Sequence, residues 1–113
     1  MLSDRSRQAL LDVRDNILLA QAFLEGLDEP GLIADRKTFY AITRCLEIIS
    51  EASRRLADDI KQRHPDQPWE RIAGAGNIYR HRYDNVAEGF VWRTVVDSLP
   101  SLLTAVEIEL GES

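Results

Sequence analysis

The residues best suited to chemistry lie at positions 76–83, which read Gly-Asn-Ile-Tyr-Arg-His-Arg-Tyr. His81 is one of two histidines in the chain, and an arginine stands on each side of it. An imidazole can move protons at neutral pH, and a guanidinium can bind a phosphate through two hydrogen bonds. These groups suffice for metal-independent cleavage of RNA, with His81 acting on the 2′-hydroxyl or leaving group and Arg80 stabilising the phosphoryl oxygens. The alternative is that His81 is an incidental surface residue.

Helical geometry decides which of these side chains can act together. At about 100° per residue, Asn77 and His81 lie roughly 40° apart and share a face. Arg80 lies about 100° from His81. Tyr83 lies about 200° from His81, so both reach one site only if the helix ends near His81. Asp84 follows Arg80 by one turn, a spacing that suits an ion pair and gives Arg80 a purely structural alternative.

Apolar residues recur at steps of three and four along most of the chain, which predicts helices. Asp35 is the expected N-cap of the second helix, and Pro100 should kink or divide the last one near residues 98 and 99. No segment alternates with period two. The sequence therefore predicts an all-α fold, a small antiparallel bundle of four to five helices in one domain over residues 1–113. The expected helices cover residues 3–27, 35–63, 69–81 and from 88 or 90 to 110. Residues 28–31, Asp-Glu-Pro-Gly, are expected to stop the first of them.

Composition narrows the class of protein. The chain has 113 residues, 44% of them hydrophobic, which is enough for one core. Its net charge of −5 argues against a protein that coats nucleic acid. Residues 71–93 carry a charge of +2 and the remainder −7, so a local cationic site is still possible. Without a signal-like start or a bilayer-length apolar run, we expect a cytoplasmic protein with no membrane contact. Cys45, the single cysteine, has apolar neighbours and is expected to be a buried thiol.

Other conspicuous residues have structural interpretations. Trp69 and Trp92 are expected to be core or interface anchors rather than platforms for base stacking. His64 has no second ligand at metal-binding spacing, so no metal site is predicted. Glu47, Glu51 and Asp58 could line one side of the second helix without a histidine partner, and we expect them to be solvated.

The segment Gly76–Tyr83 resembles the signature of HepT-like proteins in the HEPN superfamily. In that signature Arg-Asn, three variable residues, His, one variable residue and Tyr follow one another. The resemblance covers nearly the whole chain and implies a helical bundle of HEPN type. It extends to Trp69–Gly74, Val86, Trp92, Leu99–Leu102, Phe39–Ile42 and Glu47–Ala52.

Proteins of that family look like dimeric ribonuclease toxins that are usually encoded beside a minimal nucleotidyltransferase antitoxin. By this resemblance Asn77 is the polar residue of the signature and His81 the catalytic histidine. Tyr83 is the tyrosine that the antitoxin can modify with AMP. Such a modification would place a bulky anion two residues from His81 and block phosphate binding. The resemblance implies RNA as substrate and a homodimer. We expect no cofactor.

The sequence departs from the signature at one position. Where the family has arginine, this chain has Gly76. We hypothesise that Arg80 supplies the guanidinium from one turn later, because helical side chains lean toward the N-terminus. Arg82 and Arg71 are the further candidates for substrate binding. In the alternative interpretation, Gly74 and Gly76 only permit close helix contact and Arg80 pairs with Asp84.

The residues and the resemblance together predict a metal-independent endoribonuclease, and the resemblance implies that it is the toxin of a type VII-like toxin–antitoxin system. Its candidate catalytic residues are His81, Arg80 and Asn77, and AMP transfer to Tyr83 would silence it. The alternative function is a nucleotide-binding or interaction module that has lost cleavage and serves as the partner of a minimal nucleotidyltransferase.

Overall fold

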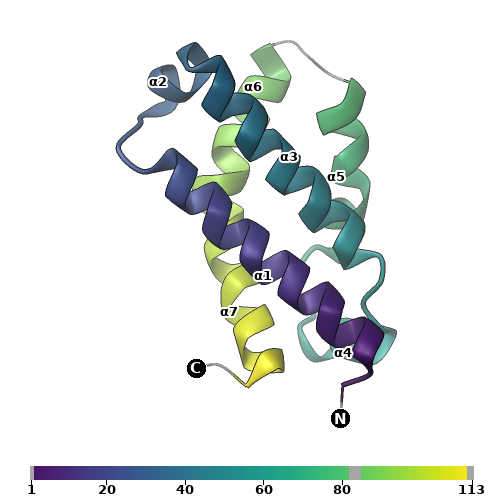
Figure 1. Ribbon diagram of the computed structural model, residues 1–113. Helices are drawn as coiled ribbons and strands as arrows, with labels where there is room; N and C mark the ends of the chain where they lie inside the picture. Colours follow the sequence, from purple (N-terminus) through teal and green to yellow (C-terminus); the bar gives the residue numbers. More distant parts are fainter. Residues whose placement is uncertain (1, 82–84, 112–113) are drawn as a thin grey trace.

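The computed structural model describes residues 2–81 and 85–111, of which 85 and 86 are described by their backbone alone. All regular structure in this range is helical, so the prediction of an all-α fold is confirmed. Within it, no helix is both long and apolar enough to cross a bilayer. The elements are α1 (Asp4–Leu24), α2 (Glu29–Ala34), α3 (Arg36–Ser53), α4 (Asp58–Arg63), α5 (Trp69–His81), α6 (Asn85–Arg93), the π-helical segment η1 (Thr94–Ser98) and α7 (Leu99–Leu110) (Figure 1).

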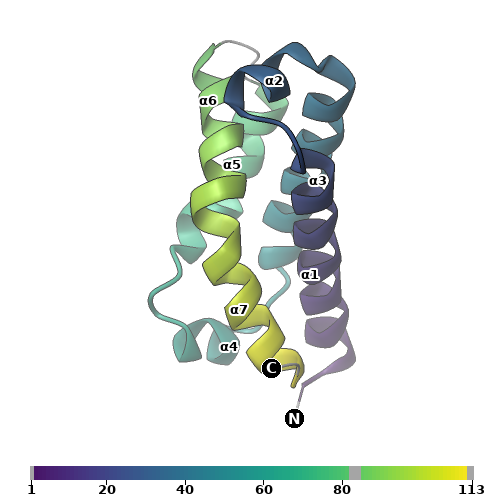
Figure 2. The same ribbon diagram turned by 90° about the vertical axis from the view of Figure 1, so that its left-hand side faces the viewer.

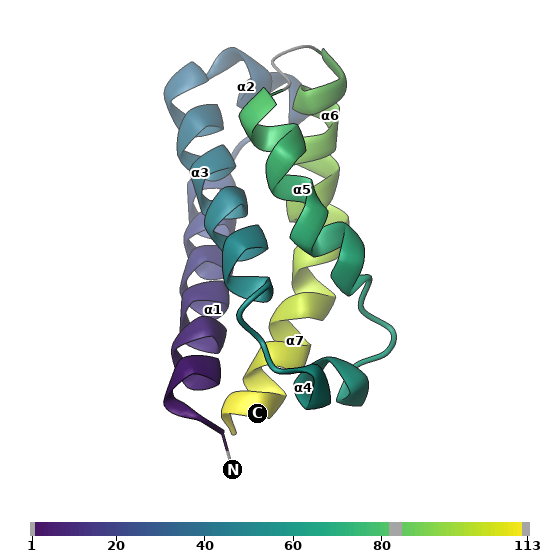
Figure 3. The same cartoon turned by 90° about the vertical axis from the view of Figure 1, so that its right-hand side faces the viewer.

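Four long columns form the antiparallel bundle. They are α1, α3, α5 and the continuous run of α6, η1 and α7 (Figures 1 and 2). Helix α3 packs against α1 on one side and α5 on the other, and α1 also packs against α7. The short helix α2 covers the end of the bundle next to α6, while α4 lies at the opposite end beside α7 (Figure 3). Helix α5 is thus held between α3 and the last column.

The core consists of the apolar stripes that periodicity predicts. Each fully buried aliphatic side chain stabilises the fold by about 1.5–3 kcal/mol relative to an exposed one. Cys45 lies in this core, and burial raises the pKa of its thiol, so the prediction of a buried thiol is confirmed. Trp69 and Trp92 pack against the core while partly buried, as expected of anchors. The innermost side chains are Leu10, Val13, Ile17, Leu32, Ile42, Leu46, Val91, Leu99 and Val106.

The prediction of one unbroken helix over residues 35–63 is wrong. Helix α3 ends at Ser53, and α4 begins at Asp58 after an extended Ala57. The Ser53 hydroxyl donates to the Ser50 carbonyl at 2.6 Å, and the N–H groups of residues 54–56 bond three residues back instead of four. Such tightened turns end an α-helix without glycine or proline. Leu56 is buried in the turn after α3, as it would be in a continuous helix. The apolar pattern therefore gave no sign of the break.

Helix α2 lies where the sequence predicted only a stop. Asp28 caps it by accepting a hydrogen bond from the Gly31 N–H at 2.8 Å, and Pro30 occupies the first turn, where its missing N–H costs nothing. Leu32 is fully buried beneath it. The expected N-cap at Asp35 is confirmed, since its carboxylate accepts the Thr38 N–H at 3.1 Å.

The last column starts at Asn85, three residues before the expected earliest start, and is divided where Pro100 predicted. A proline ring clashes with the carbonyl four residues earlier in an α-helix. Here the turn before Pro100 widens into η1, and the Leu99 N–H donates to the Thr94 carbonyl, five residues back. Helix α7 then begins at Leu99 with Pro100 in its first turn.

Candidate active site at the end of helix α5

Helix α5 spans Trp69–His81, the bounds predicted from sequence. At its start the Trp69 indole N–H lies 3.1 Å from the Lys61 carbonyl oxygen and 3.0 Å from that of His64. Near its end the Tyr79 ring is 6% exposed and lies 5.5 Å from the Phe90 ring. Both ends of the helix are therefore fixed, which holds the polar residues of its last two turns in place.

Arg80 and Asn77 contact each other directly. Nη2 of Arg80 donates to Oδ1 of Asn77 at 2.8 Å. Nη1 of Arg80 lies 3.1 Å from the position that a Cβ on Gly76 would occupy. The guanidinium thus reaches back one turn and lies over Gly76, as the leaning of helical side chains predicts. This is the placement that the replacement hypothesis requires, and the role of Arg80 in phosphate binding stays a prediction.

Gly76 also allows α5 to approach α3 closely. Its buried N–H donates to the Ser50 hydroxyl at 3.1 Å, and that hydroxyl donates to the Ala73 carbonyl at 2.9 Å. Arg54 donates to the same carbonyl through Nη2 at 2.7 Å. A Cβ on Gly76 would lie 3.0 Å from the Ser50 hydroxyl, whereas one on Gly74 would meet no atom within 4 Å. The expected close contact therefore holds for Gly76 and is wrong for Gly74.

His81 is the last residue of α5 and is exposed. Asn77, four residues earlier, is exposed as well, in keeping with the shared face that the spacing predicts. Arg82, Tyr83 and Asp84 lie outside the described residues. The substrate-binding role of Arg82, the modification of Tyr83 and the pairing of Arg80 with Asp84 stay predictions.

Arg80 forms part of the wall of a cavity of about 310 Å³ between α3, α5 and α6, which we call the Arg80 cavity. Helix α3 contributes aromatic and polar side chains, and α6 contributes small apolar ones. Tyr79 is one of the buried side chains in the lining. Its burial raises the pKa of the phenol to about 12, against the lowering effect of its bond to Thr94, so the phenol stays neutral. The residues lining the cavity are Phe39, Tyr40, Thr43, Glu47, Tyr79, Arg80, Ala87 and Val91.

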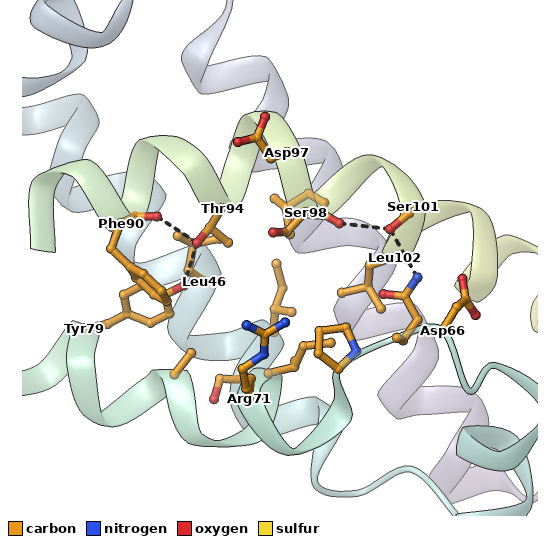
Figure 4. Close-up of a pocket in the computed structure, with 17 residues that line it drawn as sticks. Leu46, Asp66, Arg71, Tyr79, Phe90, Thr94, Asp97, Ser98, Ser101 and Leu102 are labelled. Atoms are coloured by element: carbon orange, nitrogen blue, oxygen red, sulfur yellow. Dashed lines mark hydrogen bonds between the residues drawn. The ribbon is translucent and has the colours of Figure 1, made fainter.

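Arg71 belongs to a second cavity, of about 280 Å³, between α5 and the last column. Figure 4 shows its side chain extending from α5 toward η1, with Asp97 and Asp66 at the rim. Ten residues separate Arg71 from His81, roughly 15 Å along a helix axis. Two carboxylates share this cavity with the one guanidinium, so the structure does not group Arg71 with Arg80. Its role in substrate binding stays a prediction.

Two side chains of the Arg80 cavity were not singled out as site residues. Glu47 was expected to be solvated, but only 21% of its side chain is exposed and it lines the same cavity as Arg80. Tyr40 was noted in the sequence only as part of the segment Phe39–Ile42 that resembles the family. The signal was present in their spacing: Tyr40, Thr43 and Glu47 follow one another at three and four residues, which aligns them on one face of α3.

Among residues 2–81 and 85–111, no three His, Cys, Asp or Glu side chains are grouped so that they could hold a metal ion. His64 has a structural contact instead. Its Nε2 lies 2.7 Å from Oε2 of Glu109, which also receives the Arg63 guanidinium.

Comparison with known proteins places the chain in a family. The model of the ribonuclease HepT-like family matches residues 13–108. The chain is 36% identical over 93 residues to "Probable ribonuclease HepT" of Thermococcus cleftensis, covering 82% of this chain and 84% of that protein. It is 32% identical over 108 residues to "Putative RNase MJ1380" of Methanocaldococcus jannaschii, covering 95% and 99%. No solved structure matches the chain. Since the match spans most of the sequence, the protein belongs to the ribonuclease HepT-like family, as the resemblance of its motif implied.

Proposed function

We propose that this protein is a metal-independent endoribonuclease in which His81 moves the proton and Arg80 binds the scissile phosphate. The observation that carries the proposal is the guanidinium of Arg80, which lies over Gly76 and bonds Asn77 in a chain whose relatives are named as ribonucleases. Asn77 positions this guanidinium. Arg71 and Arg82 remain candidates for binding the RNA backbone on either side.

In the proposed step, the His81 imidazole takes the proton of the 2′-hydroxyl. The 2′-oxygen then forms a bond to phosphorus while the bond from phosphorus to the 5′-oxygen breaks. The leaving oxygen takes a proton from an imidazolium or from water, so the products are a 2′,3′-cyclic phosphate and a 5′-hydroxyl. Arg80 stabilises the charge that develops on the non-bridging oxygens.

Cleavage of end-labelled RNA in the presence of EDTA tests this proposal. We expect His81→Ala to lower kcat/KM by about 10²–10⁴-fold and Arg80→Ala by about 10²-fold or more. Arg80→Lys should recover part of that loss, because it keeps the charge without the second donor. Arg5→Ala, which removes an exposed arginine of α1, is the control and should cleave normally. Wild-type rates in both site variants, from protein free of contaminating nuclease, would sink the assignment.

The proposal extends to the biological setting implied by the family signature. The enzyme acts in the cytoplasm as the toxin of a type VII-like system, and a nucleotidyltransferase antitoxin silences it by AMP transfer to Tyr83. Induction of the chain alone should arrest growth, and His81→Ala should relieve the arrest. Coexpression with the product of a neighbouring nucleotidyltransferase gene should add the mass of AMP to Tyr83, and an unmodified Tyr83 would contradict this part.

A homodimer with His81 of each subunit in one cleft is part of the proposal. Gly74, Asn77 and His81 recur at three and four residues and are all exposed, which leaves this face of α5 accessible to a second copy. Light scattering should give twice the chain mass. Oxidised Gly74→Cys should form a disulfide-linked dimer, whereas the exposed control Ala57→Cys should not. A monomeric mass would contradict the dimer.

The second candidate function is a non-cleaving interaction module that partners a nucleotidyltransferase. Gly76 favours it, because the family's arginine is absent there. Harmless expression together with tight binding to the nucleotidyltransferase would support the module over the nuclease.

A further inference from the structure

The Arg80 cavity joins the candidate cleavage site to a surface of α3. Its volume of about 310 Å³ lies at the small end of the range of about 300–1,000 Å³ for small-molecule sites. Three of its lining residues, Phe39, Ala87 and Val91, are apolar. Arg80 and Glu47 add a guanidinium and a carboxylate to the lining. A flat, largely apolar ring with polar edges suits this combination.

Tyr40 supplies an aromatic surface at the cavity. Its side chain is 56% exposed, although it is held by its neighbours. The Arg36 guanidinium lies 5.4 Å from the ring centroid, and the Phe39 ring meets it edge-on at 5.9 Å. Arg36 is itself held by Glu88 at 2.8 Å. An exposed ring that is already fixed loses little entropy when a base stacks on it.

The charges in the cavity separate a phosphate from a base. Arg80 is bonded to Asn77 on the helix surface, where an anion can reach it. Glu47 faces the cavity from α3, and a carboxylate there disfavours a second anion inside. Its contact with Arg44, at 3.6 Å, is too long for a hydrogen bond. The carboxylate oxygens can therefore accept N–H donors from a neutral ring.

We infer that the Arg80 cavity binds the nucleobase next to the scissile phosphate, with Tyr40 stacking on the ring and Glu47 selecting guanine. This rests on the proposed function, because the same arginine holds the phosphate. Guanine offers its N1–H and its amino group side by side, and one carboxylate can accept both. Uracil offers one N–H between two carbonyl oxygens, which a carboxylate repels. Adenine and cytosine each offer one amino group beside an acceptor.

Binding measurements test this inference separately from cleavage. Four oligouridine probes, carrying guanine, adenine, cytosine or uracil at one central position, are titrated with the His81→Ala protein, and Kd is read from fluorescence anisotropy. We expect the guanine probe to bind about 10–100-fold more tightly than the uracil probe, as for one bidentate contact. Glu47→Gln in the same background should abolish this preference. The control is Glu51→Gln, an exposed carboxylate one turn later on α3, which should keep it.

Tyr40→Ala should weaken the binding of all four probes by about 5–100-fold, the contribution of one stacked base. Tyr40→Phe keeps the ring and should retain most of the affinity. Equal affinity for the four probes, or a guanine preference that survives Glu47→Gln, would overturn the inference. RNA binding that Tyr40→Ala leaves unchanged would also overturn it. If wild-type protein fails to cleave while the guanine preference holds, the ribonuclease proposal fails and the base site stands. If the protein cleaves RNA but binds the four probes equally, the base site fails and the ribonuclease proposal stands.

Discussion

The Ser50 hydroxyl accepts the buried N–H of Gly76 at 3.1 Å and so links α3 to the middle of α5. It also donates to the Ala73 carbonyl at 2.9 Å, and Ser50 is only 3% exposed. Ser50→Ala should leave a buried N–H without this acceptor and lower the free energy of unfolding by about 1–3 kcal/mol. Urea denaturation measures the loss. Ser98→Ala, at an exposed serine of η1, should change the free energy by less than about 0.5 kcal/mol. Equal effects of the two substitutions would contradict this role of Ser50.

The two glycines of α5 should respond differently to alanine. Gly74→Ala places a methyl group where no atom of the same chain lies within 4 Å, so the fold of the subunit should gain about 1 kcal/mol of helix propensity. Gly76→Ala places it 3.0 Å from the Ser50 hydroxyl and 3.1 Å from Nη1 of Arg80, so crowding should cancel that gain and displace the guanidinium. The measurements are urea denaturation and RNA cleavage. Gly76→Ala with both the stability and the cleavage rate of Gly74→Ala would show that Arg80 does not depend on the space above Gly76.

The contact between Asn77 and Arg80 predicts that two substitutions of Asn77 weaken RNA binding to different extents. Asn77→Asp would turn the 2.8 Å hydrogen bond into an ion pair that competes with phosphate for the guanidinium. The Kd for RNA should rise by about 10-fold, and its salt dependence should fall by roughly one phosphate contact. Asn77→Ala removes the acceptor without adding charge and should weaken binding less. The reverse order would show that Asn77 contributes something other than the position of Arg80.

Glu109 predicts a pH effect on stability. It joins α7 to α4, with Nε of Arg63 at 3.1 Å and Nε2 of His64 at 2.7 Å. The hydrogen bond from Arg63 lowers the pKa of the Glu109 carboxyl. The contact with His64 lowers this pKa further, while burial acts in the opposite direction. Because the pKa is lower in the folded protein, the stabilisation is fully present above the unfolded value of about 4.3 and is lost as the pH falls through the folded value.

Glu109→Gln should therefore lower the urea midpoint at pH 7 and make it less sensitive to acid. Denaturation curves at pH 7, 5 and 3 test this, with Glu107→Gln as the matched change in the same helix. A mutant whose midpoint falls with acid as steeply as that of the wild-type protein would show that the carboxylate is not stabilised by folding.

Sequence periodicity predicted most of the bundle because apolar spacing reports directly on helix faces. The bounds of α5 and the division before Pro100 were predicted correctly because the residues that cause them act on the backbone within one helical turn. The end of α3 did not, because Ser53 and the turns after it break the helix without glycine or proline. Helix α2 was missed because Pro30 and Gly31 read as a stop, although Asp28 uses them to begin a new helix.

At the candidate site, the sequence predicted what lies within one helix. The position of the Arg80 guanidinium over Gly76 follows from helical geometry alone. The Arg80 cavity does not, because Tyr40 and Glu47 meet Arg80 only after α3 and α5 have packed, 33 residues or more apart in the sequence. Arg71, the other described candidate for substrate binding, lines a separate cavity, a separation that its position in the sequence does not indicate, and its role stays a prediction.

The π-helical turn at Thr94–Ser98 corrects the phase of the last column. Val91, Val95 and Leu99 recur every four residues, and each such step in an α-helix overshoots a full turn by about 40°. The wider turn absorbs this drift, so all three side chains stay in the core. A chain with one residue fewer between 94 and 98 would rotate everything after it by about 100°, carrying Leu102 and Val106 out of the core. The length of this stretch is therefore as much a packing constraint as the identity of any buried side chain.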